Sequence, residues 1–170
     1  MRILLVDDHQ MVRLGLKSFF ELQDDIEEVT EATNGREGVE KSLGSRPDVI
    51  MMDIVMPEMS GIDATLAILK EWPEAKILIL TSYLDNEKIY PVLDAGARGY
   101  MLKTSSADEI LNAVRKVAKG EFAIETEVSK KVEYHRNHIE LHEDLTARER
   151  DILGLLAKGY ENQRIADELF

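Results

Sequence analysis

Five polar residues within the first 103 positions could together hold a divalent cation and a phosphoryl group. They come directly after short apolar runs, and they are Asp7, Asp8, Asp53, Thr81 and Lys103. An apolar run of about five residues between helical patterns is typical of a strand buried on both faces of a parallel sheet. Because ligands bind beyond the carboxyl ends of such strands, where the strand order reverses, we expect these side chains to converge.

The residue types indicate which chemistry the converged group could perform. Magnesium prefers oxygen ligands, so Asp8 and Asp53 would supply carboxylates, Asp7 would act through a water, and the backbone carbonyl of Val55 would complete the set. Without metal, repulsion should raise at least one carboxyl pKa. Asp53 could then attack a phosphoryl group and form an acyl phosphate. The hydroxyl and ammonium groups named above would stabilise the transferred oxygens.

The elements that must position these residues follow from the hydrophobic pattern. Strands are predicted at 2–6, 27–32, 48–52, 76–80 and 98–102, and helices at 10–22, 35–44, 61–71, 85–95 and 106–118. Such alternation predicts an α/β fold with a right-handed, doubly wound, five-stranded parallel sheet. In the order 2-1-3-4-5, the strands that end in Asp7–Asp8 and Asp53 flank the point where the order reverses.

We therefore divide the chain into a phosphoacceptor domain at 1–120, a linker at 121–144 and a helical piece at 145–170. The linker is highly charged, and its spacing predicts a helix over about 127–142. His135, His138 and His142 lie on one face of that helix. They could ligate zinc or copper, form a pH-sensitive seam, or belong to a solvated linker.

The last 26 residues predict two short helices, which cannot form a stable core alone. Thr146 and Glu149 have the spacing of a capping box for the first helix. Gly159 is a suitable stop for that helix, and Asn162 is a suitable cap for the second.

Composition excludes several classes of protein. The chain has 170 residues, 44% of them apolar, so it can bury a sizeable core. It has no cysteine, which excludes disulfides, thiolate metal sites and a cysteine nucleophile. No apolar stretch approaches the length of about 18 residues needed for a membrane span, and no signal peptide is visible, so we expect a cytoplasmic protein without membrane contact. The net charge of −12 predicts that the chain as it stands binds DNA weakly.

Residues 1–120 resemble the receiver domain of two-component response regulators. The matching motifs are Asp7–Asp8, DIVMPEMSG with Asp53, ILTSY with Thr81, and GYMLK with Lys103. The resemblance implies that Asp53 accepts a phosphoryl group, with Mg²⁺, from a phosphohistidine on a sensor histidine kinase. It implies a phosphoacceptor that assists its own phosphotransfer rather than an enzyme. It also implies that Thr81 moves toward the phosphoryl group while Tyr100 rotates inward behind it.

The chain departs from the receiver pattern after its lysine. Many receivers have a proline there, preceded by a cis bond, whereas this chain has Thr104. A cis bond before threonine would cost about 2.5–4 kcal/mol, which leaves the geometry of that loop open. The positions two beyond Asp53 and Thr81 are Val55 and Tyr83, and neither is an obvious base for water. We therefore expect a moderately long-lived phosphoryl state.

The segment LTARERDILGLLAKGYENQRIADEL resembles the start of the LuxR-type helix-turn-helix domain of the NarL/FixJ class. That family's recognition helix, which enters the major groove, should follow but is absent from this chain. The chain thus looks C-terminally truncated, and promoter binding is expected of the full-length parent. The receiver and linker further resemble the LiaR/VraR group of cell-envelope-stress regulators of Gram-positive bacteria.

The predicted helix at 10–22 carries more apolar residues than one buried stripe requires. Met11 and Leu14 could form a dimer patch, and we expect a homodimer that forms on phosphorylation. Two alternatives remain open. A Mg²⁺-dependent phosphatase would usually carry a second acid two residues after the nucleophile, where this chain has Val55. A receiver-type interaction module could work without phosphorylation.

Overall fold

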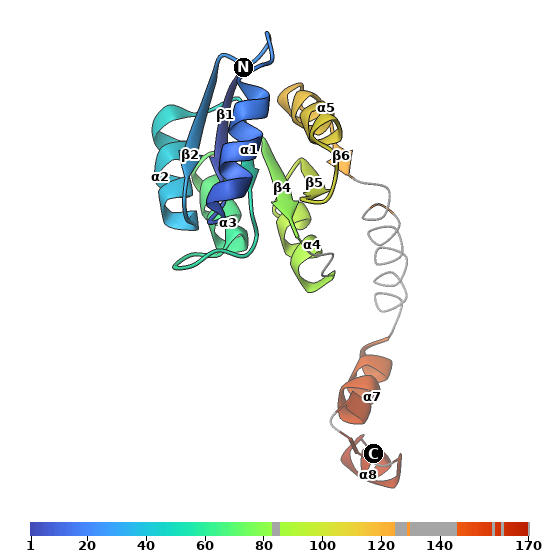
Figure 1. Cartoon of the computed structure of the whole chain (residues 1–170). Helices are drawn as coiled ribbons and strands as arrows, with labels where there is room; N and C mark the ends of the chain where they lie inside the picture. Colours follow the sequence, from blue (N-terminus) through green and yellow to red (C-terminus); the bar gives the residue numbers. More distant parts are fainter. Residues whose placement is uncertain (83–85, 125–128, 130–145, 158, 161, 170) are drawn as a thin grey trace. The chain divides into compact units, whose positions relative to one another are not determined.

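The computed structural model describes residues 1–82, 86–124, 129, 146–157, 159–160 and 162–169. They belong to two units, Met1–Ser129 and Lys130–Phe170 (Figure 1). The linker helix expected at 127–142, with its three histidines, lies outside the described residues.

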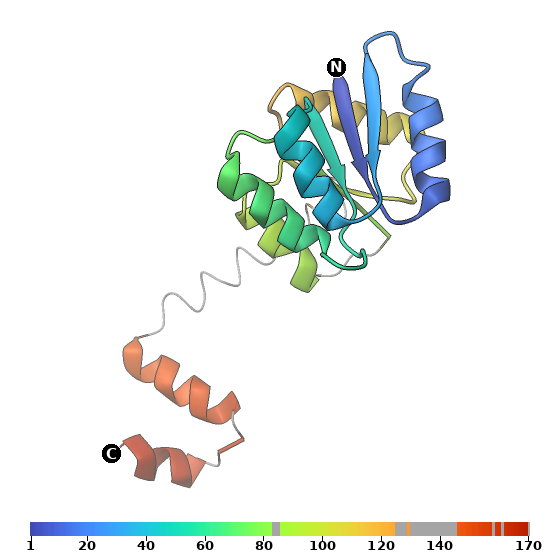
Figure 2. The same cartoon turned by 90° about the vertical axis from the view of Figure 1, so that its left-hand side faces the viewer.

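Strands and helices alternate throughout the first unit, as the hydrophobic pattern predicts. The strands are β1 (Arg2–Val6), β2 (Glu28–Ala32), β3 (Val49–Met52), β4 (Ile77–Thr81), β5 (Gly99–Leu102) and β6 (Ala123–Ile124). The helices are α1 (Gln10–Phe20), α2 (Gly35–Ser45), α3 (Gly61–Glu71), α4 (Asn86–Asp94) and α5 (Ala107–Ala118). Helices α1 and α5 cover one face of the sheet, and α2, α3 and α4 cover the other (Figures 1 and 2).

The sheet is parallel throughout and has the order β2-β1-β3-β4-β5-β6. The predicted order of the first five strands is confirmed, but the predicted number of strands is one too few. Strand β6 has only two residues, which is too short for any periodicity to reveal. It pairs with β5 at Gly99, where a Cβ atom would lie 2.6 Å from the Ala123 carbonyl oxygen. The missing side chain at Gly99 therefore permits the sixth strand.

The central strands are buried on both faces, which explains their unbroken apolar sequences. Every residue of β3 and β4 is buried, and so are residues 3–6 of β1. Helix α1 ends at Phe20, two residues before the predicted end. Phe20 is fully buried whereas Leu22 is 81% exposed, so burial of the apolar stripe stops where the helix stops.

Side-chain caps fix where several helices begin. The Asn34 side chain accepts a hydrogen bond from the backbone N–H of Glu37 at the start of α2. At the start of α5, Ser106 and Glu109 form a capping box. Such caps satisfy N–H groups that have no partner within the helix.

The second unit contains α7 (Ala147–Ala157) and α8 (Asn162–Leu169). The predicted capping box is confirmed, because Glu149 accepts hydrogen bonds from the Thr146 backbone and hydroxyl while its own N–H donates to Thr146 Oγ1. Gly159 has the positive φ of 77° expected of a helix stop. Among the described residues, no helix combines the length and the hydropathy that crossing a membrane would take.

We expect the Glu37→Gln substitution to destabilise the fold in a pH-dependent way. Hydrogen bonds from Lys41 and from the Thr33 backbone lower the pKa of Glu37 to about 2. A carboxyl whose pKa is depressed in the folded state stabilises above its ordinary pKa, and this stabilisation is lost as the pH falls through the folded value. The variant should lose about 1 kcal/mol of unfolding free energy near pH 7.

Urea unfolding near pH 7 and near pH 3 measures this loss, with Glu40→Gln on the exposed side of the same helix as the control. The difference between wild type and Glu37→Gln should shrink at the lower pH. A difference independent of pH would contradict the assignment.

Candidate functional site

The five polar residues that follow the predicted strands come from one edge of the sheet. Asp7 and Asp8 follow β1, Asp53 follows β3, Thr81 ends β4, and Lys103 follows β5. The Lys103 ammonium group lies 2.7 Å from Asp7 Oδ2 and 2.8 Å from Asp53 Oδ2. All three side chains are less than a tenth exposed. The structure thus brings together residues from strands far apart in the sequence.

Burial and the neighbouring Lys103 charge have opposite effects on the pKa of Asp53. Burial is the largest effect and raises it, whereas the hydrogen bond and charge of Lys103 lower it, and the net pKa lies above the ordinary value. The expected rise in a carboxyl pKa is therefore confirmed, but repulsion from Asp7 is only a smaller contribution. Burial alone would lower the pKa of Lys103, yet its bonds to Asp53 and Asp7 raise it.

The loop after β3 holds Asp53 through its backbone. The Asp53 N–H donates to the Val6 carbonyl oxygen at 2.8 Å, and Asp53 Oδ1 accepts from the N–H of Ile54 at 2.8 Å. The loop closes where the Gly61 N–H donates to the Ile54 carbonyl oxygen. A Cβ atom on Gly61 would lie 1.8 Å from the Asp53 carbonyl oxygen. Glycine is thus required for this close approach of backbone to backbone.

His9 belongs to the acidic cluster, although the sequence analysis did not select it. Its Nδ1 atom lies 2.8 Å from Asp8 Oδ1 and 3.2 Å from Asp7 Oδ1. One ligand atom each from Asp7, Asp8, His9 and Asp53 lies within 4.8 Å of the others. The one available signal was adjacency to the acid pair in the run Asp7-Asp8-His9.

Thr81 and Tyr100 lie on the two strands that meet beside Lys103. The Lys103 N–H donates to the Thr81 carbonyl oxygen at 2.8 Å, and Thr81 is opposite Leu102 in the ladder. Thr81 is 2% exposed and Tyr100 is fully buried. No peptide bond among the described residues is cis, so the chain continues from Lys103 to Thr104 through a trans bond.

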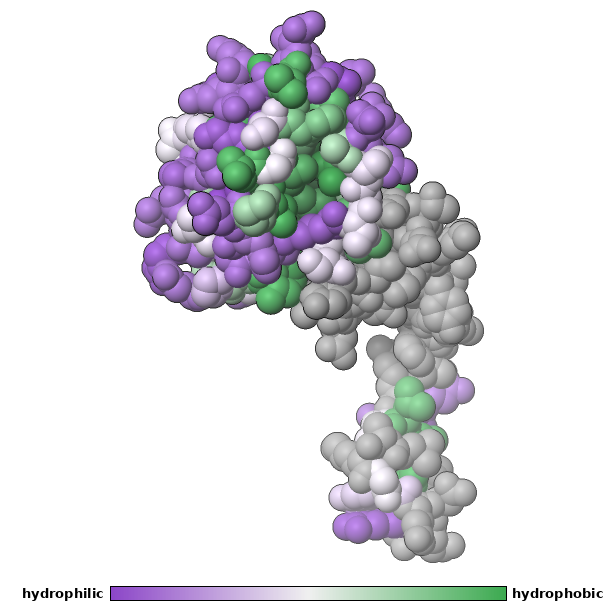
Figure 3. All heavy atoms as spheres, viewed as in Figure 1, coloured by the Kyte–Doolittle hydropathy of each residue, from purple (hydrophilic) through white to green (hydrophobic). Residues whose placement is uncertain are grey.

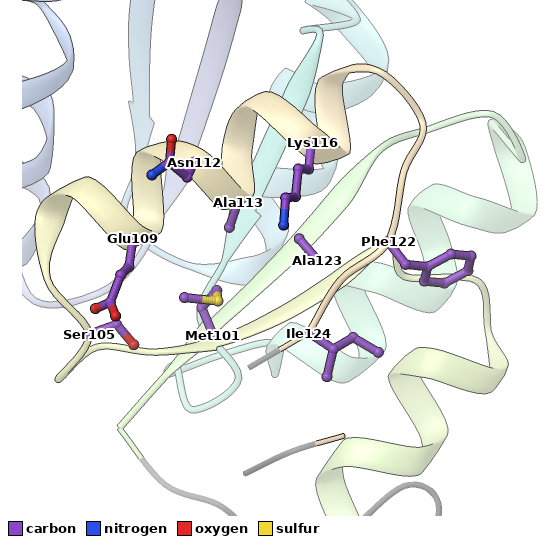
Figure 4. A pocket seen from close by; sticks show the side chains of 9 residues that line it. All are labelled: Met101, Ser105, Glu109, Asn112, Ala113, Lys116, Phe122, Ala123 and Ile124. Carbon is purple, nitrogen blue, oxygen red and sulfur yellow. The ribbon is translucent and has the colours of Figure 1, made fainter. Parts of the chain in front are cut away.

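Two open hollows flank α5. One, of about 240 Å³, lies between α1 and α5 and extends from Met11 to Lys103. Apolar side chains gather on this face of the molecule (Figure 3). The other, of about 300 Å³, lies between α5 and the β5–β6 edge, where Met101, Lys116 and Ile124 contribute to its lining (Figure 4). This larger hollow includes none of the clustered acids, so the candidate chemistry is not located there.

Comparisons with known proteins place the chain in a family. The model described as "Response regulator receiver domain" matches residues 3–115, and "Bacterial regulatory proteins, luxR family" matches residues 143–170. The chain is a LuxR-family response regulator.

Two curated relatives of the regulator agree with this assignment. The transcriptional regulatory protein LiaR of Bacillus subtilis is 49% identical over 99% of this chain and 82% of its own length. The response regulator protein VraR of Staphylococcus aureus is 46% identical over 97% of this chain and 79% of its own length.

A solved LuxR-family two-component response regulator from Aurantimonas sp. SI85-9A1 also resembles this regulator. Its TM-score is 0.74 at 31% identity, over 79% of this chain and 96% of that one. The similarity to LiaR and VraR supports the expected subgroup of the family.

We expect Gly61→Ala to destabilise the regulator, because the new methyl group would overlap the Asp53 carbonyl oxygen. Such overpacking typically costs about 1–3 kcal/mol. Gly44→Ala is the matched control, since a Cβ atom there meets nothing within 4 Å. In helix α2 it should be neutral or stabilise by up to about 1 kcal/mol. Urea unfolding compares the two, and equal effects would contradict the close-approach argument.

Proposed function

We propose that the regulator accepts a phosphoryl group on Asp53 from a phosphohistidine on a partner sensor histidine kinase. The observation that carries this proposal is the Lys103 ammonium group 2.8 Å from Asp53 Oδ2. It places a buried positive charge next to a buried carboxylate, where it would meet the oxygens of an incoming phosphoryl group. The role of each site residue below is part of this proposal.

The transfer is a displacement at phosphorus. An Asp53 oxygen attacks the phosphorus atom, the bond to the kinase imidazole nitrogen breaks, and that nitrogen keeps the electron pair. Oδ1 of Asp53 accepts from the Ile54 N–H and Oδ2 accepts from Lys103, so we assign the attack to Oδ2, the oxygen that faces the positive charge. Lys103 then exchanges part of its contact with Asp53 for the transferred oxygens. The bonds to Asp53 and Asp7 raise the pKa of Lys103, so its ammonium group carries its positive charge when the phosphoryl group arrives.

The donor set fits Mg²⁺, because it consists mainly of carboxylate oxygens. Asp8 and Asp53 would bind directly, Asp7 would act through a water, and the Val55 carbonyl would complete the protein's share. The Asp8 side chain is 31% exposed, so a hydrated ion can reach it from solvent. When bound, Mg²⁺ would offset negative charge on the phosphoryl oxygens.

Thr81 and Tyr100 form the proposed switch. The Thr81 hydroxyl would donate a hydrogen bond to a phosphoryl oxygen, which draws that side chain toward Asp53. Tyr100 already lies inside the fold, fully buried on the neighbouring strand. The inward rotation of Tyr100 that the resemblance implies is therefore not needed, and Tyr100 would stay in place behind a displaced Thr81. A phosphorylation signal at Asp53 would thereby change the packing of β4 and β5.

The phosphorylated state would act through a homodimer on the face of α1. Met11 is 77% exposed and Leu14 is 54% exposed, and their spacing of three residues places them as neighbours on one face of α1. Met11 also lines the hollow of about 240 Å³ that reaches Lys103. Because this apolar surface extends to a site residue, phosphorylation at Asp53 could change it directly. Dimerisation would then present paired DNA-binding regions to a promoter in the full-length parent.

The cellular role proposed is transcription control in the cytoplasm in response to cell-envelope stress, as expected for the LiaR/VraR group. Two other functions are less well supported. A phosphatase would need a base for water, and the position two residues after Asp53 is Val55. A phosphorylation-independent module would not require a lysine between two buried acids. We therefore propose a phosphoacceptor rather than an enzyme.

Intact mass after incubation with acetyl phosphate and magnesium tests the acceptor. The wild-type chain should gain one phosphoryl group, and Asp53→Ala should gain none. Gain on neither protein would favour the phosphorylation-independent alternative, and gain on both would identify a different acceptor. Turnover of a small phosphoester without accumulation of the phosphoprotein would favour the phosphatase.

Substitution of Met11 by aspartate tests the dimer face. With a beryllofluoride phosphoryl mimic and magnesium, the wild-type chain should become dimeric, whereas Met11→Asp should stay monomeric, because a charge cannot be buried there without a partner. Leu22→Asp is the matched control, since Leu22 is 81% exposed and does not line the hollow. Light scattering after size exclusion gives the mass. An oligomeric state unaffected by the mimic would contradict the proposal.

A further inference from the structure

The turn that carries both metal-facing acids at the end of β1 is held from helix α1. The Arg13 Nη1 atom donates to the Asp7 main-chain carbonyl oxygen at 2.7 Å. The Asp7 side chain is buried at 7% exposed, and the Arg13 side chain is largely covered at 11% exposed. A guanidinium group therefore lies directly behind the backbone from which the Asp7 and Asp8 carboxylates project.

The same guanidinium group is itself oriented by a neighbouring strand. Its Nε atom lies 3.3 Å from Glu31 Oε1 on β2. The other oxygen of Glu31 lies 3.0 Å from the Lys17 ammonium group, one helical turn further along α1. Arg13 thus links α1, the turn after β1, and β2. The planar, rigid arrangement of its donors suits this kind of simultaneous contact.

We propose that Arg13 is a positioning residue that sets the divalent-cation affinity of the site by fixing the Asp7–Asp8 turn. It would touch neither the cation nor the phosphoryl group. Arg13, Asp7 and Asp53 line one small cavity of about 10 Å³, so Arg13 lies close to the acids that it would orient. This inference rests on the proposed function in one respect, namely that the acids hold a cation.

Lys17 offers a control that distinguishes a positioning role of Arg13 from a merely structural one. It extends from the same helix and binds the same Glu31 carboxylate as Arg13. Among the described contacts, however, only Arg13 reaches the Asp7 carbonyl oxygen. Loss of Lys17 removes a link between α1 and β2, whereas loss of Arg13 also removes the hydrogen bond to the Asp7 carbonyl oxygen.

Calorimetric titration of the full chain with MgCl₂ tests the proposal, with Arg13→Gln, Arg13→Lys and Lys17→Gln compared with wild type. Removal of a group that orients a ligand typically weakens metal binding by about 10-fold to 100-fold. We expect Arg13→Gln to raise the Kd for Mg²⁺ about tenfold by that precedent. Arg13→Lys should have a Kd between those of wild type and Arg13→Gln, because a lysine keeps the charge but not the forked donors. Lys17→Gln should change the Kd less than twofold.

Phosphorylation by acetyl phosphate provides a second readout. For Arg13→Gln, the magnesium concentration that gives half the maximal rate should rise by the same factor as the Kd, and saturating magnesium should restore the rate. A purely structural defect would lower the rate at every magnesium concentration. Circular dichroism and urea unfolding establish that each variant is folded. If Arg13→Gln does not fold, the comparison of Arg13→Lys with Lys17→Gln decides.

Two results would overturn the inference while leaving the proposed function intact. In one, wild type binds magnesium and is phosphorylated, but Arg13→Gln binds magnesium equally well. In the other, Lys17→Gln weakens binding as much as Arg13→Gln does. A wild-type chain that binds no magnesium would instead remove the proposed cation site, and the role of Arg13 with it.

Discussion

The ammonium group of Lys103 allows two carboxylates to lie buried at the same edge of the sheet. Asp7 and Asp53 are each within 2.8 Å of it and almost inaccessible to solvent. Removing one member of a buried, charged group typically costs about 3–5 kcal/mol, because the remaining charges lose their partner. Because both acids are buried, β5 must end where Lys103 can reach them both. The position of β5 beside β4 is therefore a condition of this buried, charged cluster.

The sequence was sufficient to predict which residues converge, because the site lies where strands end. Asp7, Asp53, Thr81 and Lys103 each follow an apolar run, and parallel strands present their carboxyl ends on one side. It was insufficient for His9, which directly precedes α1, and for Arg13 on α1, whose contact depends on the rotation of that helix. Strand β6 was also missed, since two residues carry no periodicity and its pairing depends on the missing side chain of Gly99.

The cause of the raised pKa at Asp53 illustrates the same limit. Counting carboxylates in the sequence correctly indicates a rise, but it attributes that rise to repulsion. In the fold, removal of Asp53 from water contributes more than its neighbour Asp7 does. The loop after β3 can close against the Asp53 backbone only because residue 61 has no side chain, and the sequence alone does not reveal that requirement.

Helix α1 combines two tasks that use different faces. One face exposes Met11 and Leu14, the pair proposed for the dimer interface. Another directs Arg13 to the turn that carries Asp7. A rigid helix cannot move one face without the other, so a contact made at Met11 is mechanically linked to the backbone beneath the acids. By thermodynamic reciprocity, if dimerisation raised the affinity of the site for the proposed cation, then binding of that cation would favour the dimer by the same factor. This linkage requires only the rigidity of α1 and the short bond from Arg13 to the Asp7 carbonyl oxygen.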